Sequence, residues 1–281
     1  RLTAQLKDAN WALAAAAVGF SLLTYVGSAM ALSSSVAQRI PVARATLVAL
    51  AGSFVNRVTP AKVGGMALNL RFLQKSGVPT AVASASIGLY SIVGAITHIT
   101  LLIIFSFWAG KAVNLADLLP GNAILIAVAG IVLGLIGVIA FVPKVRTFIA
   151  EKVRPEAVKV RANLQELLQH PVRMVLIVVG SAILTLSYIW ALDVSIKAFG
   201  GEIALPVVAV IYLAGASIAS AAPTPGGVGA VEAALIGGLT AAGLPTEVTV
   251  PGVFLYRLAT FWIPVLPGWG AFSWLQRREF V

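Results

Sequence analysis

The stretch SAAPTPGGVGAVEAALIGGLTAAGLPT, residues 220–246, departs from the composition of the chain on either side of it. Its 27 residues hold three prolines, six glycines and one carboxylate, Glu232, between segments that are apolar enough to lie in lipid. Proline lacks the N–H group that a helix interior needs, and glycine allows backbone conformations that other residues avoid. The stretch therefore predicts a break in a buried helical segment, next to an acidic side chain.

The composition of the whole chain indicates a membrane protein. Hydrophobic residues make up 59% of the 281 positions, charged residues only 11%, and the mean hydropathy is +0.96, far from an ordinary soluble domain. The chain has no cysteine, which excludes disulfides, a thiol nucleophile and a Cys-based metal site. The net charge of +10 would favour nucleic acid in a soluble protein, but basic loops beside membrane spans face anionic lipid head groups. We therefore expect a lipid partner and no nucleic acid.

Five apolar segments are long enough to cross a hydrocarbon core of about 30 Å at about 1.5 Å per residue. They lie at about 10–34, 79–107, 121–142, 174–198 and 247–275. Two further stretches, about 45–76 and 203–243, are interrupted by Thr-Pro, and each half is too short to cross comfortably. We expect an all-α polytopic membrane protein: one transmembrane domain over residues 1–281, with about five full spans plus two broken, re-entrant helical hairpins.

The basic residues predict the orientation of these spans. The connection over residues 143–173 carries seven of them, and the positive-inside rule places it in the cytoplasm. Counting outward from this connection, six more fall on the same side as the C-terminus: Arg39, Arg44, Arg71, Lys75, Arg277 and Arg278. That side then holds 13 of the 20 basic residues. The N-terminus falls outside, and because residue 1 is Arg rather than Met we expect an upstream segment.

The two interrupted stretches resemble each other. TPAKVG at 59–64 matches TPGGVG at 224–229, and GVPT at 77–80 matches GLPT at 243–246. Leu-Ala-Gly before each break and Leu-Tyr after it also match, over about 45 residues in all. Chance similarity between apolar segments would not keep these motifs in phase, so the pattern predicts an internal repeat.

The predicted topology inverts the second repeat relative to the first. We place repeat one at about 10–107, a linking span at 121–142, the cytoplasmic connection at 143–173 and repeat two at about 174–275. Because the linking span is an odd crossing, the first hairpin enters and leaves on the cytoplasmic side and the second on the outer side. Inverted repeats with helices broken near the midplane are typical of transporters, and the breaks indicate the substrate site.

The chemistry of the breaks predicts an anion site. Helices that begin near Pro60 and Pro225 would direct unpaired N–H groups and positive dipole ends toward the membrane centre. Arg57 and Lys62 add positive charge at the first break. A phosphate head group is the natural ligand. The alternative is that prolines and glycines only allow close helix packing, as they often do in membranes.

Two further ionisable residues fall within the membrane. Arg257 lies about ten residues into the last span, roughly 15 Å deep, and Glu232 lies about two turns into the second half-helix. Ionisable residues at that depth are paired or functional. We expect a Glu232–Arg257 pair beside the break, which serves either the substrate or only the packing of the hairpin against the span.

A resemblance to a known family rests on two segments, APTPGGVGAVEAAL at 222–235 and FLYRLATFWIPVLPGWGAF at 254–272. They resemble the second signature of the lysylphosphatidylglycerol synthase transmembrane family. Its Pro-Gly-Gly-x-Gly-x-x-Glu and Tyr-Arg patterns are matched by Pro225, Gly226, Gly227, Gly229, Glu232, Tyr256 and Arg257. Its earlier Asn-x-x-Thr-Pro-x-x-x-Gly pattern is matched by Asn56, Thr59, Pro60 and Gly64. The resemblance covers the chain from about residue 10.

The resemblance implies a flippase-like protein of the bacterial cytoplasmic (inner) membrane that translocates a lipid. The residues and the resemblance together give these substrate-binding candidates: Arg57, Thr59, Pro60, Lys62, Gly64, Thr224, Pro225, Gly226, Gly227, Gly229, Glu232, Tyr256 and Arg257. The first half departs from the family, with Gly65 where many relatives carry an acid and Tyr90-Ser91 where many carry Glu-Arg. We expect an anionic phospholipid or a polyprenyl-phosphate-linked lipid as ligand.

Two other functions remain open. One is a non-transporting module that binds lipid for a partner synthase or glycosyltransferase. A more remote one is an intramembrane serine hydrolase, because Ser217 lies in a Gly-Ala-Ser segment and His98 lies in a span. No metal-ligand spacing, Walker motif or dinucleotide motif occurs, so we expect no cofactor, metal or enzyme activity.

Overall fold

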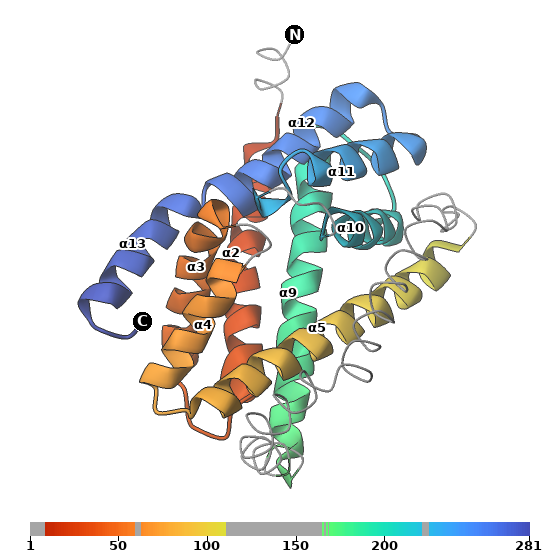
Figure 1. Cartoon of the computed structure of the whole chain (residues 1–281). Coiled ribbons are helices and arrows are strands. Elements are labelled where there is room, and N and C mark those ends of the chain that lie inside the picture. Colours follow the sequence, from red (N-terminus) through yellow and green to blue (C-terminus); the bar gives the residue numbers. More distant parts are fainter. Residues whose placement is uncertain (1–8, 60–62, 111–164, 166, 168, 221–224) are drawn as a thin grey trace, which may run out of the picture.

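A computed structural model describes residues 9–59, 63–110, 165, 167, 169–220 and 225–281, and every regular element among them is helical (Figure 1). The elements are α2 (Trp11–Ser34), α3 (Val42–Val58), α4 (Val63–Lys75), α5 (Thr80–Ala109), α9 (Pro171–Lys197), α10 (Leu205–Ser220), η3 (Pro225–Gly227), α11 (Ala230–Ala241), α12 (Thr246–Arg257), η4 (Leu258–Trp262) and α13 (Val265–Arg277). The expected linking span 121–142 and most of the connection 143–173 lie outside the described residues, as do Pro60, Lys62 and Thr224.

Within the described ranges, four helical segments are long and apolar enough to cross a membrane: Trp11–Ser34, Thr80–Ala109, Pro171–Lys197 and Thr246–Arg277. They coincide with four of the five spans that the sequence predicts, so the chain is a polytopic membrane protein. The last of them is not one regular α-helix. It consists of α12, the π-helical turn η4 and α13 in succession.

The outer surface of α5 shows what surrounds these helices. Large apolar side chains at a helical spacing are exposed along it: Ile92, Ile96, Ile99, Ile103 and Phe107, which is 84% exposed. A soluble protein rarely exposes a continuous apolar stripe of this length. Contact with lipid tails explains the stripe, because it leaves no apolar surface in water.

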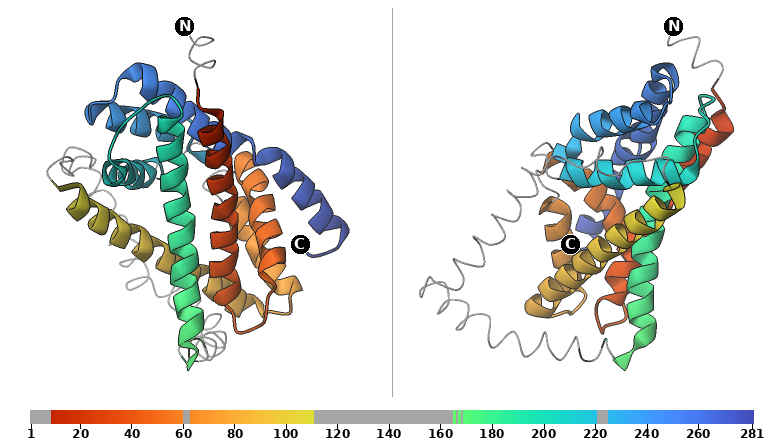
Figure 2. Two further views of the ribbon diagram at one scale, coloured as in Figure 1. Left: turned by 180° about the vertical axis from the view of Figure 1, so that it is seen from behind. Right: turned by 90° about the vertical axis from the view of Figure 1, so that its right-hand side faces the viewer.

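The two central helices, α2 and α9, cross at a pair of glycines (Figure 2). A Cβ atom on Gly27 would lie 2.7 Å from the Gly180 carbonyl oxygen, so any side chain there would separate the two backbones. Close packing of this kind is the main source of helix association in lipid, where water does not drive apolar surfaces together. The first and fourth of the five predicted spans therefore form one tight antiparallel pair.

Two hydrogen bonds define the ends of this pair. The Asn10 N–H donates to the Ala198 carbonyl at 2.9 Å, and Arg173 Nη1 donates to the Val36 carbonyl at 2.7 Å. We call these the Ala198 end and the Val36 end. The apolar cluster at the Val36 end also contains Ile40, Leu73, Val78 and Leu275. The α4–α5 turn and the C-terminal helix therefore lie at the same end.

Each interrupted stretch forms two helices that pack antiparallel. In the first, Gly52 of α3 lies against Gly65 of α4, where an added Cβ would be 3.7 Å from the Gly65 Cα. In the second, Gly215 of α10 lies against Ala234 of α11. The outer ends of α3 and α4 belong to the cluster at the Val36 end, whereas α10 and α11 pack in the other apolar cluster, together with Ile196, Leu244 and Tyr256. The two hairpins therefore pack in separate apolar clusters.

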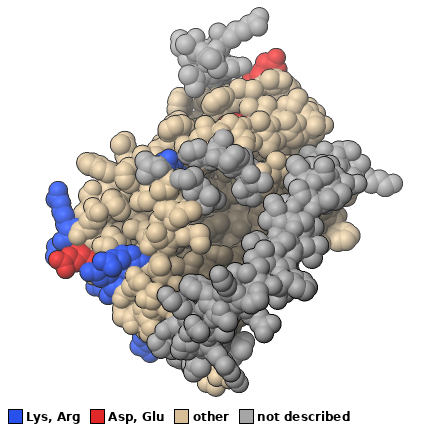
Figure 3. All heavy atoms as spheres, in the orientation of Figure 1, with Lys and Arg blue, Asp and Glu red and all other residues tan. Residues whose placement is uncertain are grey.

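Lysine and arginine side chains gather at one end of the molecule, with an acidic side chain among them (Figure 3). Seven described cations belong to segments at the Val36 end, together with Glu279: Arg39, Arg44, Arg71, Lys75, Arg173, Arg277 and Arg278. Glu202, which precedes α10, and Glu247, in the first turn of α12, belong to the Ala198 end, where Lys197 also lies. The positive end is the one that the sequence places in the cytoplasm, and that orientation stays a prediction.

Candidate functional site

The second break is built on glycines with left-handed backbone angles. Gly226, Gly227 and Gly229 have φ values of +62°, +68° and +84°. Residues with a side chain avoid this region because Cβ approaches the following carbonyl. The backbone therefore turns sharply between η3 and α11, and α11 begins at Ala230. The glycines that the sequence singled out at this break are needed for its conformation.

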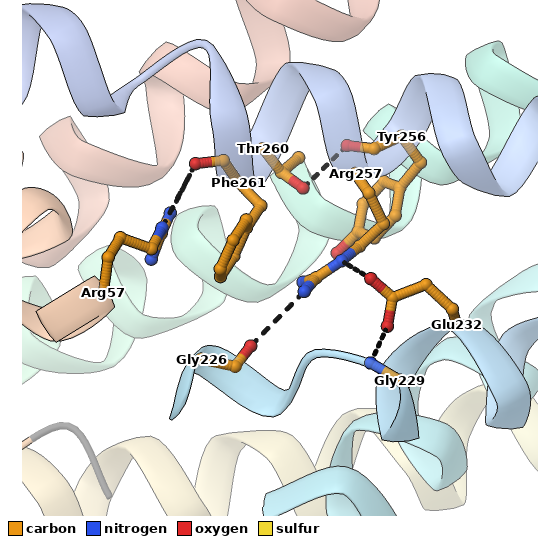
Figure 4. A network of polar contacts seen from close by, with 8 residues as sticks. All are labelled: Arg57, Gly226, Gly229, Glu232, Tyr256, Arg257, Thr260 and Phe261. Carbon is orange, nitrogen blue, oxygen red and sulfur yellow. Dashed lines mark hydrogen bonds and ion pairs between the residues drawn. The ribbon is translucent and has the colours of Figure 1, made fainter. Parts of the chain in front are cut away.

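Glu232 closes this turn with both carboxylate oxygens. Its Oε2 accepts the Gly229 N–H at 2.8 Å, and its Oε1 accepts Arg257 Nε at 2.7 Å (Figure 4). Arg257 Nη2 donates further to the Gly226 carbonyl at 3.3 Å. The predicted Glu232–Arg257 pair is thereby confirmed, with side chains 17% and 8% exposed. A carboxylate in the first turn of α11 also interacts favourably with the positive end of the helix dipole.

The first break is held by neutral side chains instead. The Gly65 N–H donates to Asn56 Oδ1 at 2.8 Å, and the Gly64 N–H donates to Thr59 Oγ1 at 3.2 Å. The expectation of unpaired N–H groups at the start of α4 is wrong for these two groups, because residues at the end of α3 cap them. A Cβ on Gly64 would lie 2.5 Å from the Thr59 hydroxyl, so the cap requires glycine.

Arg57, at the end of α3, reaches across to the last span. Its Nε and Nη2 donate to the Phe261 carbonyl at 3.2 and 2.9 Å, and its Cζ lies 3.7 Å from the centre of the Phe261 ring. The Arg257 Cζ lies 4.2 Å from the same ring centre. Figure 4 shows the Phe261 ring between the two arginines. The two breaks, more than 160 residues apart in the numbering, therefore meet at one aromatic side chain.

The last span changes its hydrogen-bond pattern beside Phe261. The Ile263 N–H donates to the Leu258 carbonyl at 2.8 Å, a step of five residues that widens the helix. Pro264 then has no N–H, and a new helix begins at Val265. The Phe261 carbonyl therefore lies in an irregular turn, and π-helical turns are frequent at functional sites.

The remaining predicted residues contribute to the fold around the site. Pro225 starts η3, next to Gly226. Tyr256 is 4% exposed and lies within an aromatic group with Tyr212 and Tyr188, with ring centres 6.4 and 6.0 Å apart along the group. Tyr256 therefore packs the core beside the Glu232–Arg257 pair, and its side chain is closed off from the surface.

Sequence reasoning missed Phe261. It stood in the quoted signature segment, but only as one apolar residue of a span. A signal was present, because the sequence provides Arg57 with no acidic residue near the first break. Inside a membrane protein, an arginine without a carboxylate partner needs a carbonyl oxygen or an aromatic face as its partner. No such partner of Arg57 was predicted from the sequence.

The Ser217 and His98 side chains lie close together. His98 Nε2 lies 3.2 Å from Ser217 Oγ and 3.0 Å from the Leu213 carbonyl oxygen, which also accepts the Ser217 hydroxyl at 2.9 Å. In the tautomer that carries a hydrogen on Nε2, this nitrogen donates to the carbonyl and does not take the serine proton. Among the described residues, no group of three or more His, Asp or Glu side chains is placed to hold a metal ion.

A comparison with protein families agrees with this architecture. The sequence model of the lysylphosphatidylglycerol synthase TM region matches residues 1–268. The chain belongs to this family. Membership links the protein to the metabolism or translocation of membrane lipids. No curated protein matches the chain closely enough to add a named relative.

Proposed function

We propose that the protein translocates an anionic phospholipid or a polyprenyl-phosphate-linked lipid across the bacterial cytoplasmic membrane. The observation that carries the proposal is the charge balance where the two breaks meet. Arg257 is paired with Glu232, whereas Arg57 has no acidic partner among the described residues. One uncompensated positive charge in a low-dielectric region attracts an anion.

The hydrogen bonds of Arg57 support a phosphate as that anion. A guanidinium has five N–H groups, which form one fork along Nε and Nη2 and a second along Nη1 and Nη2. The first fork is directed to the Phe261 carbonyl. The second fork has no partner among the described residues, and its geometry fits two oxygens of one phosphate. Arg57 is only half-buried, so this fork is within reach of a ligand.

The depth of the site supports transport between leaflets. Arg57 lies 15 residues beyond the start of α3 at Val42, about 22 Å along the helix. Arg257 lies 11 residues beyond the start of α12 at Thr246, about 17 Å along the helix. Both arginines are therefore far from the ends at which their helices begin. A head group bound there would be near the middle of its path.

The inverted relation of the two hairpins is part of this proposal. We infer that one hairpin opens toward the Val36 end and the other toward the Ala198 end. The packing of the two hairpins in separate apolar clusters, with their breaks meeting at Phe261, supports this arrangement and the division into repeat one, linking span, connection and repeat two. The positive Val36 end then faces the cytoplasm, and each hairpin re-enters on its own side.

Within this mechanism the two arginines have different tasks. Arg57 contacts the phosphate. The Glu232–Arg257 pair, 17% and 8% exposed, fixes the Gly-rich turn against the last span and keeps its own charge balanced. Gly226, Gly227 and Gly229 let the turn approach closely, and Asn56 and Thr59 hold the first break in register with it.

Transport of fluorescent phosphatidylglycerol in liposomes reconstituted with the full chain tests the proposal. We expect Arg57→Gln to reduce the rate at least tenfold, because the charge that binds the phosphate is lost. Arg71→Gln is the matched control, since Arg71 is an exposed arginine of the same hairpin. Transport that survives in Arg57→Gln contradicts the site. Wild-type protein that binds the lipid without moving it supports a lipid-holding module for a partner synthase or glycosyltransferase instead.

A further inference from the structure

Phe261 makes contacts with every part of the site. Its carbonyl accepts two hydrogen bonds from Arg57, and its ring lies beneath the guanidinium of Arg57 at 3.7 Å and beside that of Arg257 at 4.2 Å. The same ring fills the space next to Gly226, where an added Cβ would collide with it. The side chain is 6% exposed, so it is a fixed part of the fold rather than a mobile surface ring.

We propose that Phe261 is a positioning residue for the anion. Its ring, packed on the Arg57 guanidinium, keeps one fork directed at the Phe261 carbonyl so that the other fork stays available to a lipid phosphate. This inference rests on the proposed function of Arg57 and adds the residue that makes Arg57 competent for it.

The physical need for such a residue follows from the chain itself. A long arginine side chain without a partner samples many rotamers, and ordering it on binding would oppose affinity. A carboxylate partner would order Arg57 but would also neutralise it. A backbone carbonyl and an aromatic face order the guanidinium and leave its full positive charge in place.

The ring also separates two like charges. In Figure 4 the Phe261 ring lies between the guanidinium groups of Arg57 and Arg257. Each cation meets the negative face of the π system rather than the other cation. Glu232 therefore remains paired with Arg257 alone, and Arg57 is not drawn into the same ion pair.

The second break holds the ring in this place. Because Gly226 has no Cβ, its backbone fits against the edge of the ring, and Arg257 Nη2 bonds to the Gly226 carbonyl. The conformation of the Gly-rich turn in repeat two is thereby linked to the orientation of an arginine in repeat one. A change at the turn is expected to reach Arg57 through Phe261.

Lipid preference of the purified full chain tests the inference. Native mass spectrometry measures the ratio of bound phosphatidylglycerol to bound phosphatidylcholine for wild type, Phe261→Leu, Phe261→Tyr, Arg57→Gln and the double variant Phe261→Leu/Arg57→Gln. Phe280→Leu is the matched control, because it also removes an aromatic ring from an arginine, Arg44, at 4.9 Å and at the Val36 end. Thermal melting is recorded for each variant, and Phe261→Met replaces Phe261→Leu if the latter does not purify.

We expect Phe261→Leu to lower the preference for phosphatidylglycerol about fivefold, as loss of a cation–π contact with a half-exposed arginine implies. Phe261→Tyr should restore it, Phe280→Leu should not change it, and the double variant should equal Arg57→Gln. A lower melting temperature with unchanged preference overturns the inference, as does a further loss in the double variant. If Arg57→Gln alters the preference and Phe261→Leu does not, only the positioning role fails. If Arg57→Gln itself has no effect, the proposed anion site fails as well.

Discussion

The two breaks begin with the same Thr-Pro sequence, yet different groups satisfy their backbones. At the first, the amide of Asn56 and the hydroxyl of Thr59 accept the N–H groups of Gly65 and Gly64. At the second, a carboxylate, Glu232, accepts the Gly229 N–H and also binds Arg257. A neutral cap leaves a neighbouring cation unbalanced, whereas an acidic cap balances it.

This difference explains how one site holds two arginines in different states. Arg57 lies beside the neutrally capped break and keeps its charge, and within the described part of the chain the ring and carbonyl of Phe261 hold it. Arg257 lies beside the acidic break and is neutralised by its pair. At the first break, Gly65 provides no carboxylate that could balance Arg57. The two breaks thus differ in charge although both begin with Thr-Pro.

The proposed opposite opening of the two hairpins predicts the largest effect, which is on the side of the membrane from which single cysteines are labelled. The natural chain has no cysteine, so single cysteines report without background. Cysteine at Lys75 should react with a membrane-impermeant maleimide only from the cytoplasmic side, and cysteine at Pro245 only from outside. Cysteine at Arg278 is the control for the cytoplasmic side. Labelling of Lys75 and Pro245 from the same side is incompatible with an inverted pair.

Variants of Glu232 and Arg257 test how much the acidic cap of the second break contributes to stability. Glu232→Gln and Arg257→Gln should each destabilise the protein by about 3–5 kcal/mol, because each leaves one charge buried without its partner. The double variant should cost much less than the sum, since no charge remains. Melting of all three variants in detergent gives the coupling directly. Additive effects would mean that the two side chains do not support each other.

The transport rate of the double variant separates support from binding. If the pair only fixes the turn, Glu232→Gln/Arg257→Gln should retain transport of phosphatidylglycerol at a reduced rate, and Arg57→Gln should abolish it. Loss of transport in Arg257→Gln without a change in stability would instead give Arg257 the contact with phosphate. Arg277→Gln, an exposed arginine near the C-terminus, is the control for charge alone.

Glycine at the second break gives a smaller effect. Gly226→Ala combines an unfavourable φ of +62° with a collision against the Phe261 ring, and we expect a loss of about 2–3 kcal/mol. Gly237→Ala is the control, because Gly237 lies within α11 with open space around it and alanine favours the helix by up to about 1 kcal/mol. Equal melting temperatures for the two variants would show that the turn does not depend on Gly226.

Much of the fold was accessible from the sequence, for physical reasons. Apolar length and Thr-Pro interruptions locate spans and breaks, because lipid requires every backbone group to be satisfied within helices. The Glu232–Arg257 pair was predictable because a buried charge needs an opposite charge and few are available. These features depend on single residues and their spacing along the chain.

Contacts between distant segments were less accessible. The capping of Gly64 and Gly65 depends on how α4 packs back on α3, and the meeting of Arg57 with Phe261 depends on how α3 lies against the last span. An arginine that donates to a backbone carbonyl and packs on a ring has no acidic partner, so the sequence does not indicate which residue it contacts. Likewise, residue types alone suggested a pair of His98 and Ser217. The Leu213 carbonyl that both side chains contact belongs to the backbone, so the sequence does not reveal it.

The neutral cap of the first break gives the smallest effect that we predict. Asn56→Ala removes the acceptor of the Gly65 N–H, and loss of one helix cap costs about 1 kcal/mol. Thr59→Ala should cost a similar amount through Gly64. We expect both variants to keep the preference for phosphatidylglycerol, because neither adds nor removes a charge near Arg57.

Asn56→Asp tests the charge of this cap separately from its hydrogen bond. The carboxylate still accepts the Gly65 N–H, so stability should stay near that of the natural protein, but a negative charge now lies one residue from Arg57. If the uncompensated charge of Arg57 recruits the lipid, Asn56→Asp should weaken phosphatidylglycerol binding while Asn56→Ala does not. Thermal melting and the lipid ratio from native mass spectrometry provide both readouts. Equal lipid preference in Asn56→Asp and Asn56→Ala would mean that the neutrality of this cap has no role in binding.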